Sequence, residues 1–310
     1  MTDARAIRYV GQSLRRREDF KLITGKGRYV DDIKLPGMLH MAVLRSPHAH
    51  AVINRVDLTE AAAAPGVRLV LSGGDLVGRI GSIVPNWIIP GTKVPVRPVV
   101  AVDRVRFVGE CVALVVAESQ TMAYDAVGLI DVDYEALPAV VDEEAATRDG
   151  APQLHDNVPN NITTVFKVRG GDYQQAAREA DQIIRLRVVN NRLIPTCMET
   201  RAVIADPNAD GTLTVYIPSQ VPHMHRRWIA ETVGIPEHLL RIVAPDIGGG
   251  FGARCTSTPR ICFAPIWRAN SELPSSGGSR APKAINRRAT AALIPKPSRP
   301  LSATMARSSA

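Results

Sequence analysis

Hydrophobic and polar positions in the first half of the chain follow the two patterns that distinguish strands from helices. Short apolar runs bounded by turn residues predict strands at 38–44, 67–71, 112–117 and 129–134. Helices are predicted between these runs, at 57–64 and 119–127. Strands and helices that recur at this spacing indicate a compact α/β domain over residues 25–145.

A second unit follows a polar linker at residues 146–162. Within residues 163–254, apolar runs predict strands at 165–169, 183–190, 212–217 and 239–243. Helices are predicted at 171–180 and 226–233, and Gly234 ends the second helix. Residues 1–24 are polar and basic, and we interpret them as an N-terminal surface arm.

The last predicted strand leads into the loop Gly248-Gly249-Gly250-Phe251-Gly252, where side chains are almost absent. Consecutive glycines can take positive φ and expose their N–H groups, so the loop can form a concave nest for an anion or oxo group. Phe251 would supply one bulky contact. The loop lacks the Lys-Ser/Thr pair of a P-loop and the spacing of a dinucleotide fingerprint. A simple tight turn is the alternative that this motif leaves open.

Composition and charge narrow the class of protein. With 310 residues and 45% hydrophobic content, the chain can bury a sizeable core, and its length suggests two domains. The net charge of +8 comes from residues 255–310, which hold nine basic residues against one acid, Glu272. Because residues 1–254 are formally neutral, the charge does not indicate a nucleic-acid partner for the folded part.

Targeting signals and cysteine spacing are also informative. No apolar run approaches the roughly 18 residues that a membrane span needs, and the N-terminus has no signal-peptide pattern. We therefore expect a cytoplasmic protein without a membrane span. The cysteines are scattered, without a C-x-x-C pair, which argues against a zinc site or an iron–sulfur cluster on this chain.

Two groups of histidines raise the question of a metal site. His40, His48 and His50 have no carboxylate or cysteine beside them at ligand spacing. His223 and His225 could reach a common metal only from a strand, and a strand is not expected directly after a proline. We predict no metal ligand among the side chains of this chain.

Several motifs occur in a fixed order along the chain: GKGRYVDD at 25–32, RSPHAHA at 45–51, VGECVA at 108–113, VDYEALP at 132–138, METR at 198–201, SQ at 219–220 and GGGFG at 248–252. In these motifs the sequence resembles the large, cofactor-binding subunit of the molybdenum hydroxylases. This family comprises xanthine dehydrogenase, aldehyde oxidase and aerobic carbon monoxide dehydrogenase. The resemblance runs over nearly all of residues 10–254.

The resemblance implies an α/β (α+β) fold, with an α/β hammerhead domain at 25–145 and the first part of a molybdopterin-binding domain at 163–254. It implies a molybdenum–molybdopterin cofactor, with the cytosine dinucleotide form expected. The cofactor-binding residues implied are Gln220, Gly248, Gly249, Gly250, Phe251 and Gly252. In the family, the glycine loop approaches molybdenum and pterin through backbone N–H groups, the phenylalanine lines the site, and the glutamine donates a hydrogen bond.

The activity implied is hydroxylation or oxidation of an aldehyde, an N-heterocycle or carbon monoxide at a molybdopterin centre. The partners implied are an iron–sulfur small subunit and a FAD-binding medium subunit. The general-base glutamate of the family lies beyond the matched region, so we expect this chain to lack turnover alone. We interpret Glu199 and Arg201 as a structural ion pair. The alternative is a non-catalytic α/β interaction module that docks on electron-transfer subunits.

The resemblance stops after Arg254. Residues 255–310 are rich in Ser, Pro, Ala and Arg, an abrupt change that a shifted reading frame in a GC-rich gene would produce. We hypothesise that this segment is an out-of-frame, disordered basic tail, because it has few large apolar residues to offset its ordering entropy. A genuine basic tail is the alternative, and translation of the genomic DNA in the other two frames distinguishes the two.

Overall fold

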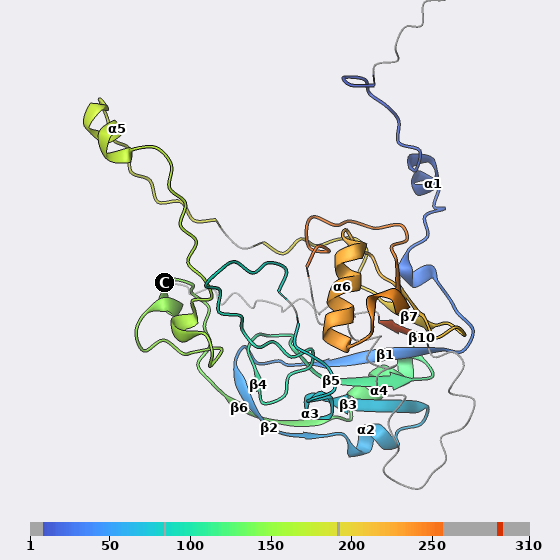
Figure 1. Ribbon diagram of the computed structural model, residues 1–310. Helices are drawn as coiled ribbons and strands as arrows, with labels where there is room; N and C mark the ends of the chain where they lie inside the picture. Colours follow the sequence, from blue (N-terminus) through green and yellow to red (C-terminus); the bar gives the residue numbers. More distant parts are fainter. Residues whose placement is uncertain (1–8, 84, 191–192, 257–289, 294–310) are drawn as a thin grey trace, which may run out of the picture.

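The computed structural model describes residues 9–83, 85–190, 193–256 and 290–293 of the chain. Figure 1 shows a body of sheets and helices from which two arms extend. One arm carries α1 (Asp19–Ile23), and the other carries α5 (Tyr173–Glu179). The first arm covers the described part of the segment that we interpret as an N-terminal surface arm.

The largest sheet has four strands in the order β10-β1-β5-β3. β5 (Cys111–Ala117) lies between β1 (Met38–Arg45) and β3 (Val67–Ser72) and pairs antiparallel with both. Every residue of β5 is buried, as predicted from its apolar side chains on both faces. The fourth strand, β10 (Thr290–Leu293), runs parallel to β1.

Short helices pack on this sheet. α4 (Gln120–Val127) begins after Ser119, whose side chain accepts a hydrogen bond from Met122 N at 3.2 Å, as predicted for an N-cap. Ala123 of α4 packs with Ala42 and Ala117 of the sheet, because small side chains allow a close approach. The other short helices near β3 are α2 (Thr59–Ala63) and α3 (Gly73–Leu76).

A second sheet has three strands in the order β4-β2-β6. β2 (Ala51–Asp57) pairs antiparallel with both β4 (Arg104–Val105) and β6 (Asp131–Ala136). Ile53 of β2 packs in one hydrophobic cluster with Val112 of β5, so this sheet lies against the first one.

A third sheet positions the glycine loop. Its strands, in the order β7-β8-β9, are β7 (Ile204–Pro207), β8 (Leu213–Tyr216) and β9 (Leu240–Val243). β8 is antiparallel to β7 and parallel to β9, and α6 (Pro222–Val233) connects β8 to β9. Gly234, with φ of 78°, ends α6 as predicted.

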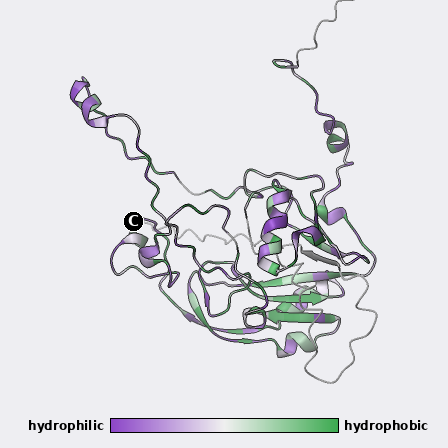
Figure 2. Cartoon of the chain, in the orientation of Figure 1, coloured by the Kyte–Doolittle hydropathy of each residue, from purple (hydrophilic) through white to green (hydrophobic). Residues whose placement is uncertain are grey.

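One hydrophobic core joins the third sheet to the first. Trp228 and Ile229 of α6 and Val215 of β8 belong to the same buried cluster as Leu114 and Val116 of β5. In Figure 2 the strands are mostly hydrophobic, whereas α6 carries both hydrophobic and hydrophilic residues, as expected for a helix with one buried face. The second unit therefore packs directly on the first.

The structure corrects two predicted strands. Residues 165–169 and 183–190 pair with no strand in the described part of the chain, and Ile184 and Leu186 are 86% and 82% exposed. The helix predicted between them is present as α5, at the end of the arm seen in Figure 1. Local sequence favours an extended backbone here, but a strand also needs a neighbour to satisfy its backbone groups.

Turns of 3-10 helix complete the described elements: η1 (Val30–Asp32), η2 (Ala145–Thr147), η3 (Pro159–Asn161) and η4 (Glu237–Leu239). In the predicted linker, Asn161 Oδ1 accepts a hydrogen bond from Leu154 N at 2.9 Å, and its Nδ2 donates to Ala146 O at 2.9 Å. The linker is therefore held together by side-chain hydrogen bonds.

The prediction of disorder for residues 255–310 is wrong at Thr290–Leu293. These residues form β10, which pairs with Met38 to Met41 of β1. A free strand edge on β1 allows this pairing whatever the composition of the surrounding tail. Cys255 and Thr256 continue the glycine loop, and the rest of the tail lies outside the described residues. The reading-frame hypothesis stays a prediction.

Candidate functional site

The glycine loop after β9 has a backbone conformation that residues with side chains rarely adopt. φ is 106° at Gly249 and 76° at Gly252. Phe251 also lies in the left-handed region, with φ of 47°, which is uncommon for a bulky residue. Its side chain is 76% exposed. The loop is therefore a strained turn that presents Phe251 beside bare backbone.

Two side chains pack so closely beneath the loop that a Cβ added to the glycine above would force the side chain to move. A Cβ at Gly248 would lie 2.5 Å from Glu199 Cβ. A Cβ at Gly250 would lie 2.6 Å from Gln220 Cδ. The glycines are thus explained by close packing as well as by backbone conformation.

Glu199 and Arg254 hold the two ends of the loop. Glu199 Oε2 accepts a hydrogen bond from Gly248 N at 2.9 Å and lies 3.0 Å from Arg254 Nη1. Arg254 Nη2 donates to the backbone oxygen of Glu199 at 2.7 Å. Both side chains are nearly buried, with 12% of Glu199 and 3% of Arg254 exposed. The ion pair therefore joins the two ends of the loop.

The predicted ion pair between Glu199 and Arg201 is therefore wrong. The glycine loop turns the chain back toward Glu199, so the residue that pairs with the Glu199 carboxylate is Arg254, which is distant in sequence. Arg201 instead donates from Nη2 to Ala253 O at 2.8 Å. Burial and the nearby charge of Arg254 lower the pKa of Arg201. Both arginines thus contact the loop end.

Gln220 lies just before α6 and contacts the loop from the other side. Its side-chain Oε1 accepts a hydrogen bond from Arg254 N at 3.3 Å, and its backbone N–H donates to Arg254 O at 3.4 Å. The side-chain Oε1 thus has a partner, whereas the side-chain Nε2 has no acceptor among the described residues. An uncharged donor is therefore available beside the glycine backbone.

Several backbone amides of the loop also have no acceptor in the described part of the chain. Gly248 N donates to Glu199, and Ala253 N donates to Gly250 O at 2.9 Å. The amides between them, from Gly249 to Gly252, donate to no described group. Together with Gln220 Nε2 they form a set of donors that can bind an oxo or anionic group.

An N-terminal segment anchors the entry to the loop. Asp246 Oδ1 lies 2.6 Å from Lys21 Nζ, and its Oδ2 accepts a hydrogen bond from Arg28 N at 2.8 Å. Asp246 N donates in turn to Arg28 O at 3.1 Å. The hydrogen bond from Lys21, with that from Arg28, lowers the pKa of Asp246. The first motif, at 25–32, therefore contacts the residue two positions before the last motif, at 248–252.

The two histidines of α6 do not face a common point. They lie in the first turn of a helix, where residues two apart point in different directions. His225 is buried edge-on against Trp228, with ring centroids 5.2 Å apart, whereas His223 is exposed. Burial lowers the pKa of His225. The described residues contain no group of three His, Cys, Asp or Glu side chains that could hold a metal ion.

Comparison with known proteins identifies both units. The aldehyde oxidase and xanthine dehydrogenase a/b hammerhead domain matches residues 24–138. The molybdopterin cofactor-binding domain matches residues 154–271, which include Gln220 and the glycine loop. The chain belongs to the large subunits of the molybdenum hydroxylases. The family resemblance and the fold class seen in the sequence are confirmed.

Individual molybdenum hydroxylases match over most of this chain but only part of their own. Quinoline 2-oxidoreductase from Pseudomonas putida 86 is 35% identical with a TM-score of 0.79, over 92% of this chain and 34% of that chain. The carbon monoxide dehydrogenase large chain of Hydrogenophaga pseudoflava is 38% identical over 76% of this chain and 30% of its own. The nicotine 6-hydroxylase large subunit of Paenarthrobacter nicotinovorans is 32% identical over 86% of this chain and 32% of its own. The chain thus spans about a third of the length of these curated relatives.

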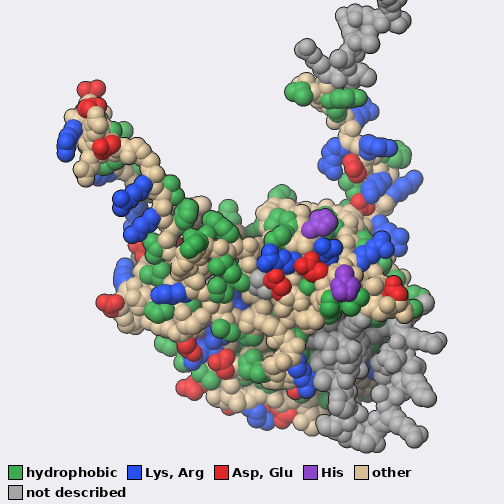
Figure 3. All heavy atoms as spheres, in the orientation of Figure 1, with side chains coloured by type: hydrophobic (Ala, Val, Ile, Leu, Met, Phe, Trp, Pro, Cys, Tyr) green, Lys and Arg blue, Asp and Glu red, His purple; other side chains and the backbone are tan. Residues whose placement is uncertain are grey.

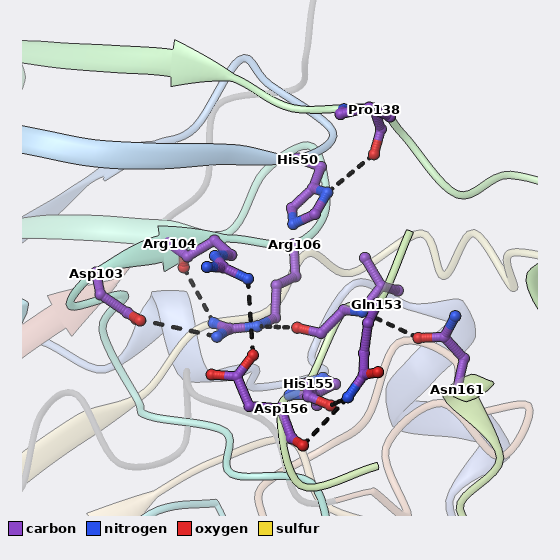
Figure 4. A network of polar contacts seen from close by, with 10 residues as sticks. His50, Asp103, Arg104, Arg106, Pro138, Gln153, His155, Asp156 and Asn161 are labelled. Atoms are coloured by element: carbon purple, nitrogen blue, oxygen red, sulfur yellow. Dashed lines mark hydrogen bonds and ion pairs between the residues drawn. The ribbon is translucent and has the colours of Figure 1, made fainter. Parts of the chain in front are cut away.

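This molybdenum hydroxylase chain contains a separate cavity of about 450 Å³, between α3 of the hammerhead domain and the segment from His155 to Asn157. Figure 4 shows Arg106 at the centre of its polar contacts. Arg106 Nε donates to Leu154 O at 2.7 Å, and Nη1 donates to Arg104 O at 3.1 Å. Burial, reinforced by the Arg106 charge, lowers the pKa of His155. The cavity shares no lining residue with the glycine loop.

Sequence reasoning missed Lys21, Asp246 and Arg254 as residues that hold the loop. The charged residue at each end of the glycine loop was the available signal, but that signal does not show which residue pairs with which.

Within the described residues, no helix has the length and hydropathy needed to cross a membrane.

Proposed function

We propose that this chain supplies the hammerhead domain and part of the molybdopterin-binding site of an oxidoreductase large subunit. The whole subunit hydroxylates or oxidises an aldehyde, an N-heterocycle or carbon monoxide. The observation that supports this most directly is the set of amide donors from Gly249 to Gly252, which have no acceptor among the described residues, beside Gln220 Nε2. In a simple turn, these amides would form hydrogen bonds within the turn or with water. No side-chain donor would be expected beside them.

The residues present fit a molybdenum–molybdopterin cofactor. Oxo and phosphate groups accept hydrogen bonds, and this loop offers several donors without a positive charge at the contact. Gln220 would donate to the molybdenum centre, the amides of Gly249, Gly250 and Gly252 would bind oxo or pterin groups, and Phe251 would line the site. When bound, the cofactor supplies oxidation of an electron-poor carbon. Glu199 and Arg254 keep the donors in place.

The partners follow from the same proposal. An iron–sulfur small subunit and a FAD-binding medium subunit would carry the electrons away, since the chain has no cysteine pattern for a cluster of its own. The cofactor would be in its cytosine dinucleotide form. Cys197 and Cys255 are free thiols, which fits a cytoplasmic location. Turnover would require the remainder of a large subunit, including the general base.

Cofactor content of the purified chain tests this proposal. We would express the full chain in a host that makes molybdopterin and measure molybdenum by mass spectrometry and pterin by fluorescence after oxidation. Retained cofactor that is lost in Gln220→Leu, but kept in Gln174→Leu, supports the proposal. Gln174 lies on α5, away from the loop, and provides the matched control.

The second candidate function is a non-catalytic interaction module. It is favoured by the hammerhead clusters around Ala51 and Ala42, which are buried without help from the glycine loop. No retained molybdenum or pterin, together with a single cooperative thermal transition, would support the module and contradict cofactor binding.

A further inference from the structure

The cavity beside α3 combines apolar walls with a nearly buried cation. Its volume of about 450 Å³ lies within the range of pockets that bind small molecules. Leu76, Val99 and Val100, which line it, are 4%, 2% and 2% exposed, so its inner wall is part of the hydrophobic core. The cavity shares no residue with the glycine loop, so a ligand bound here would be separate from the proposed cofactor.

Close packing and hydrogen bonds hold the walls of this cavity in place. A Cβ added at Gly73 would lie 2.0 Å from Ala101 O, so α3 lies directly against the segment that forms the next wall. On another side, Asn157 Nδ2 donates a hydrogen bond to Val94 O at 2.6 Å. The cavity is therefore formed in the chain without a ligand, which reduces the entropy that binding would cost.

Arg106 supplies a positive charge to this cavity, and its side chain is only 12% exposed. Figure 4 shows how its neighbours orient the guanidinium, because Nε donates to Leu154 O and Nη1 donates to Arg104 O. Nη2 has no hydrogen-bond acceptor among the described residues. The nearby Asp103 Oδ1 lies 3.9 Å from it, beyond hydrogen-bond distance. A nearly buried charged donor of this kind favours an anionic acceptor.

Two acidic residues also line the cavity, but neither forms a hydrogen bond with Arg106. Asp103 is 66% exposed and Asp156 is 86% exposed, so water screens both charges. Burial lowers the pKa of His155, and the charges of Arg106 and Arg97 lower it further, against the opposing charge of Asp156. At this wall the positive charges therefore outweigh the negative one, which favours an anion.

The preference for an anion is a property of the cavity rather than of the whole surface. On the face of the body that Figure 3 shows, acidic and basic side chains are interspersed. Residues 1–254 are also formally neutral. A general electrostatic attraction of anions to the folded part is therefore not expected.

We propose that this cavity binds a small organic carboxylate with an apolar body. The carboxylate would accept hydrogen bonds from Arg106 Nη2, and the apolar body would lie against Leu76, Val99 and Val100. An inorganic anion would leave the apolar wall in contact with water, whereas a neutral apolar molecule would leave Nη2 without an acceptor. The inference goes beyond the proposed function and does not depend on it.

Direct binding measurements test the inference. Naphthoate carries a carboxylate on an apolar ring system, and naphthamide is a neutral molecule of nearly the same size. Isothermal titration calorimetry of the purified full chain with each probe gives the affinity and the stoichiometry. We expect one naphthoate per chain and an affinity for naphthamide roughly tenfold lower, because a hydrogen bond to a charged group is lost. No binding of naphthoate at millimolar concentration, or equal affinities for the two probes, would overturn the proposal.

Substitution of Arg106 tests which side chain binds the carboxylate. Arg106→Gln should lower the affinity for naphthoate by roughly tenfold. Arg45→Gln is the matched control, because Arg45 also donates to a backbone oxygen, Gly109 O at 2.8 Å, and does not line the cavity. Equal affinities of these two folded variants would contradict the role of Arg106.

A substitution that fills the cavity keeps the proposal testable even if Arg106→Gln does not fold. Val96 lines the cavity and is 59% exposed, so Val96→Trp adds volume there without removing a core side chain. It should abolish naphthoate binding. Val141→Trp is the control, because Val141 is 89% exposed and does not line the cavity. Equal naphthoate affinities of Val96→Trp and Val141→Trp would overturn the proposal.

Discussion

Glu199 and Arg254 form an ion pair, with Oε2 and Nη1 3.0 Å apart, that joins the start of the glycine loop to its end. The same carboxylate accepts the Gly248 amide, and the same guanidinium donates to the Glu199 backbone. Since the exposed donors of the loop depend on this closure, the pair determines the shape of the candidate cofactor site.

Arg254→Met should destabilise the chain strongly. It leaves the Glu199 carboxylate nearly buried without its charge partner, and breaking a buried pair in this way costs about 3–5 kcal/mol. Urea unfolding of the two proteins gives the difference in the free energy of unfolding.

The control for that change is Arg227→Met. Arg227 pairs with Glu231 across one turn of α6, with 59% and 38% of the two side chains exposed. An exposed pair of this kind is worth about 0–1 kcal/mol. If Arg254→Met lowers the free energy of unfolding no more than Arg227→Met does, the Glu199–Arg254 ion pair does not stabilise the loop.

Gly250→Ala should displace Gln220. The added Cβ would lie 2.6 Å from Gln220 Cδ, a contact that forces a shift and costs about 1–3 kcal/mol. Gly170→Ala is the control, because nothing lies within 4 Å of the added Cβ. The double variant with Gln220→Ala should lose less stability than the sum of the two changes, since the clashing group is gone. Additive free energies from urea unfolding would contradict this packing.

Asp246→Asn should weaken the anchor between the N-terminal segment and the loop in a pH-dependent way. The pKa of Asp246 is lowered in the folded chain, so its contribution is present above the unfolded pKa and is lost as pH falls through the folded value. The variant should therefore have a lower melting temperature at about pH 7 and approach the unchanged chain as pH falls well below the unfolded value of 3.8.

Thermal melts over that pH range provide the measurement. Asp149→Asn is the control, because Asp149 is exposed. A melting difference for Asp246→Asn that persists undiminished in acid would show that the carboxylate charge is not what anchors the loop.

His225→Phe should reduce the acid sensitivity of the fold. The pKa of His225 is lowered in the folded state, chiefly by burial, so the unfolded chain binds the proton more readily. Stability is therefore lost as pH falls through the unfolded value of 6.5. Phenylalanine keeps a ring against Trp228 without a titrating group.

Urea midpoints at about pH 7.5 and about pH 5.5 provide the measurement. The loss of stability between them should be smaller in His225→Phe than in the unchanged chain. The exposed residue His238 provides the control, as His238→Phe. Equal losses for all three proteins would mean that His225 is not the group that titrates.

Sequence patterns predicted the elements whose signal is local. The run at 112–117 became β5 because its side chains are apolar on both faces, and Ser119 became an N-cap because its hydroxyl reaches an amide one turn away. Neither β2 (Ala51–Asp57) nor β7 (Ile204–Pro207) was predicted. Their short, partly polar sequences become strands through the neighbours that pair with them.

The opposite error occurred in the arm. Residues 183–190 have a clear strand pattern, yet they pair with no strand in the described part of the chain. The alternation of apolar and polar residues shows that a segment has side chains suited to a sheet, but a sheet also requires a second strand. The candidate site shows the same division, since Gly248 to Gly252 and Gln220 were identified by motif and the partner of Glu199 was not.

By itself, the sequence determined the family motifs, the glycine loop and the backbone freedom that the loop requires, because these depend on residue type and short spacing. Tertiary structure alone decided that Arg254 rather than Arg201 meets Glu199, that Lys21 reaches Asp246, and which apolar segments have no strand neighbour among the described residues. Those relationships join residues far apart in the chain, and their energies exist only after folding brings the groups within contact distance.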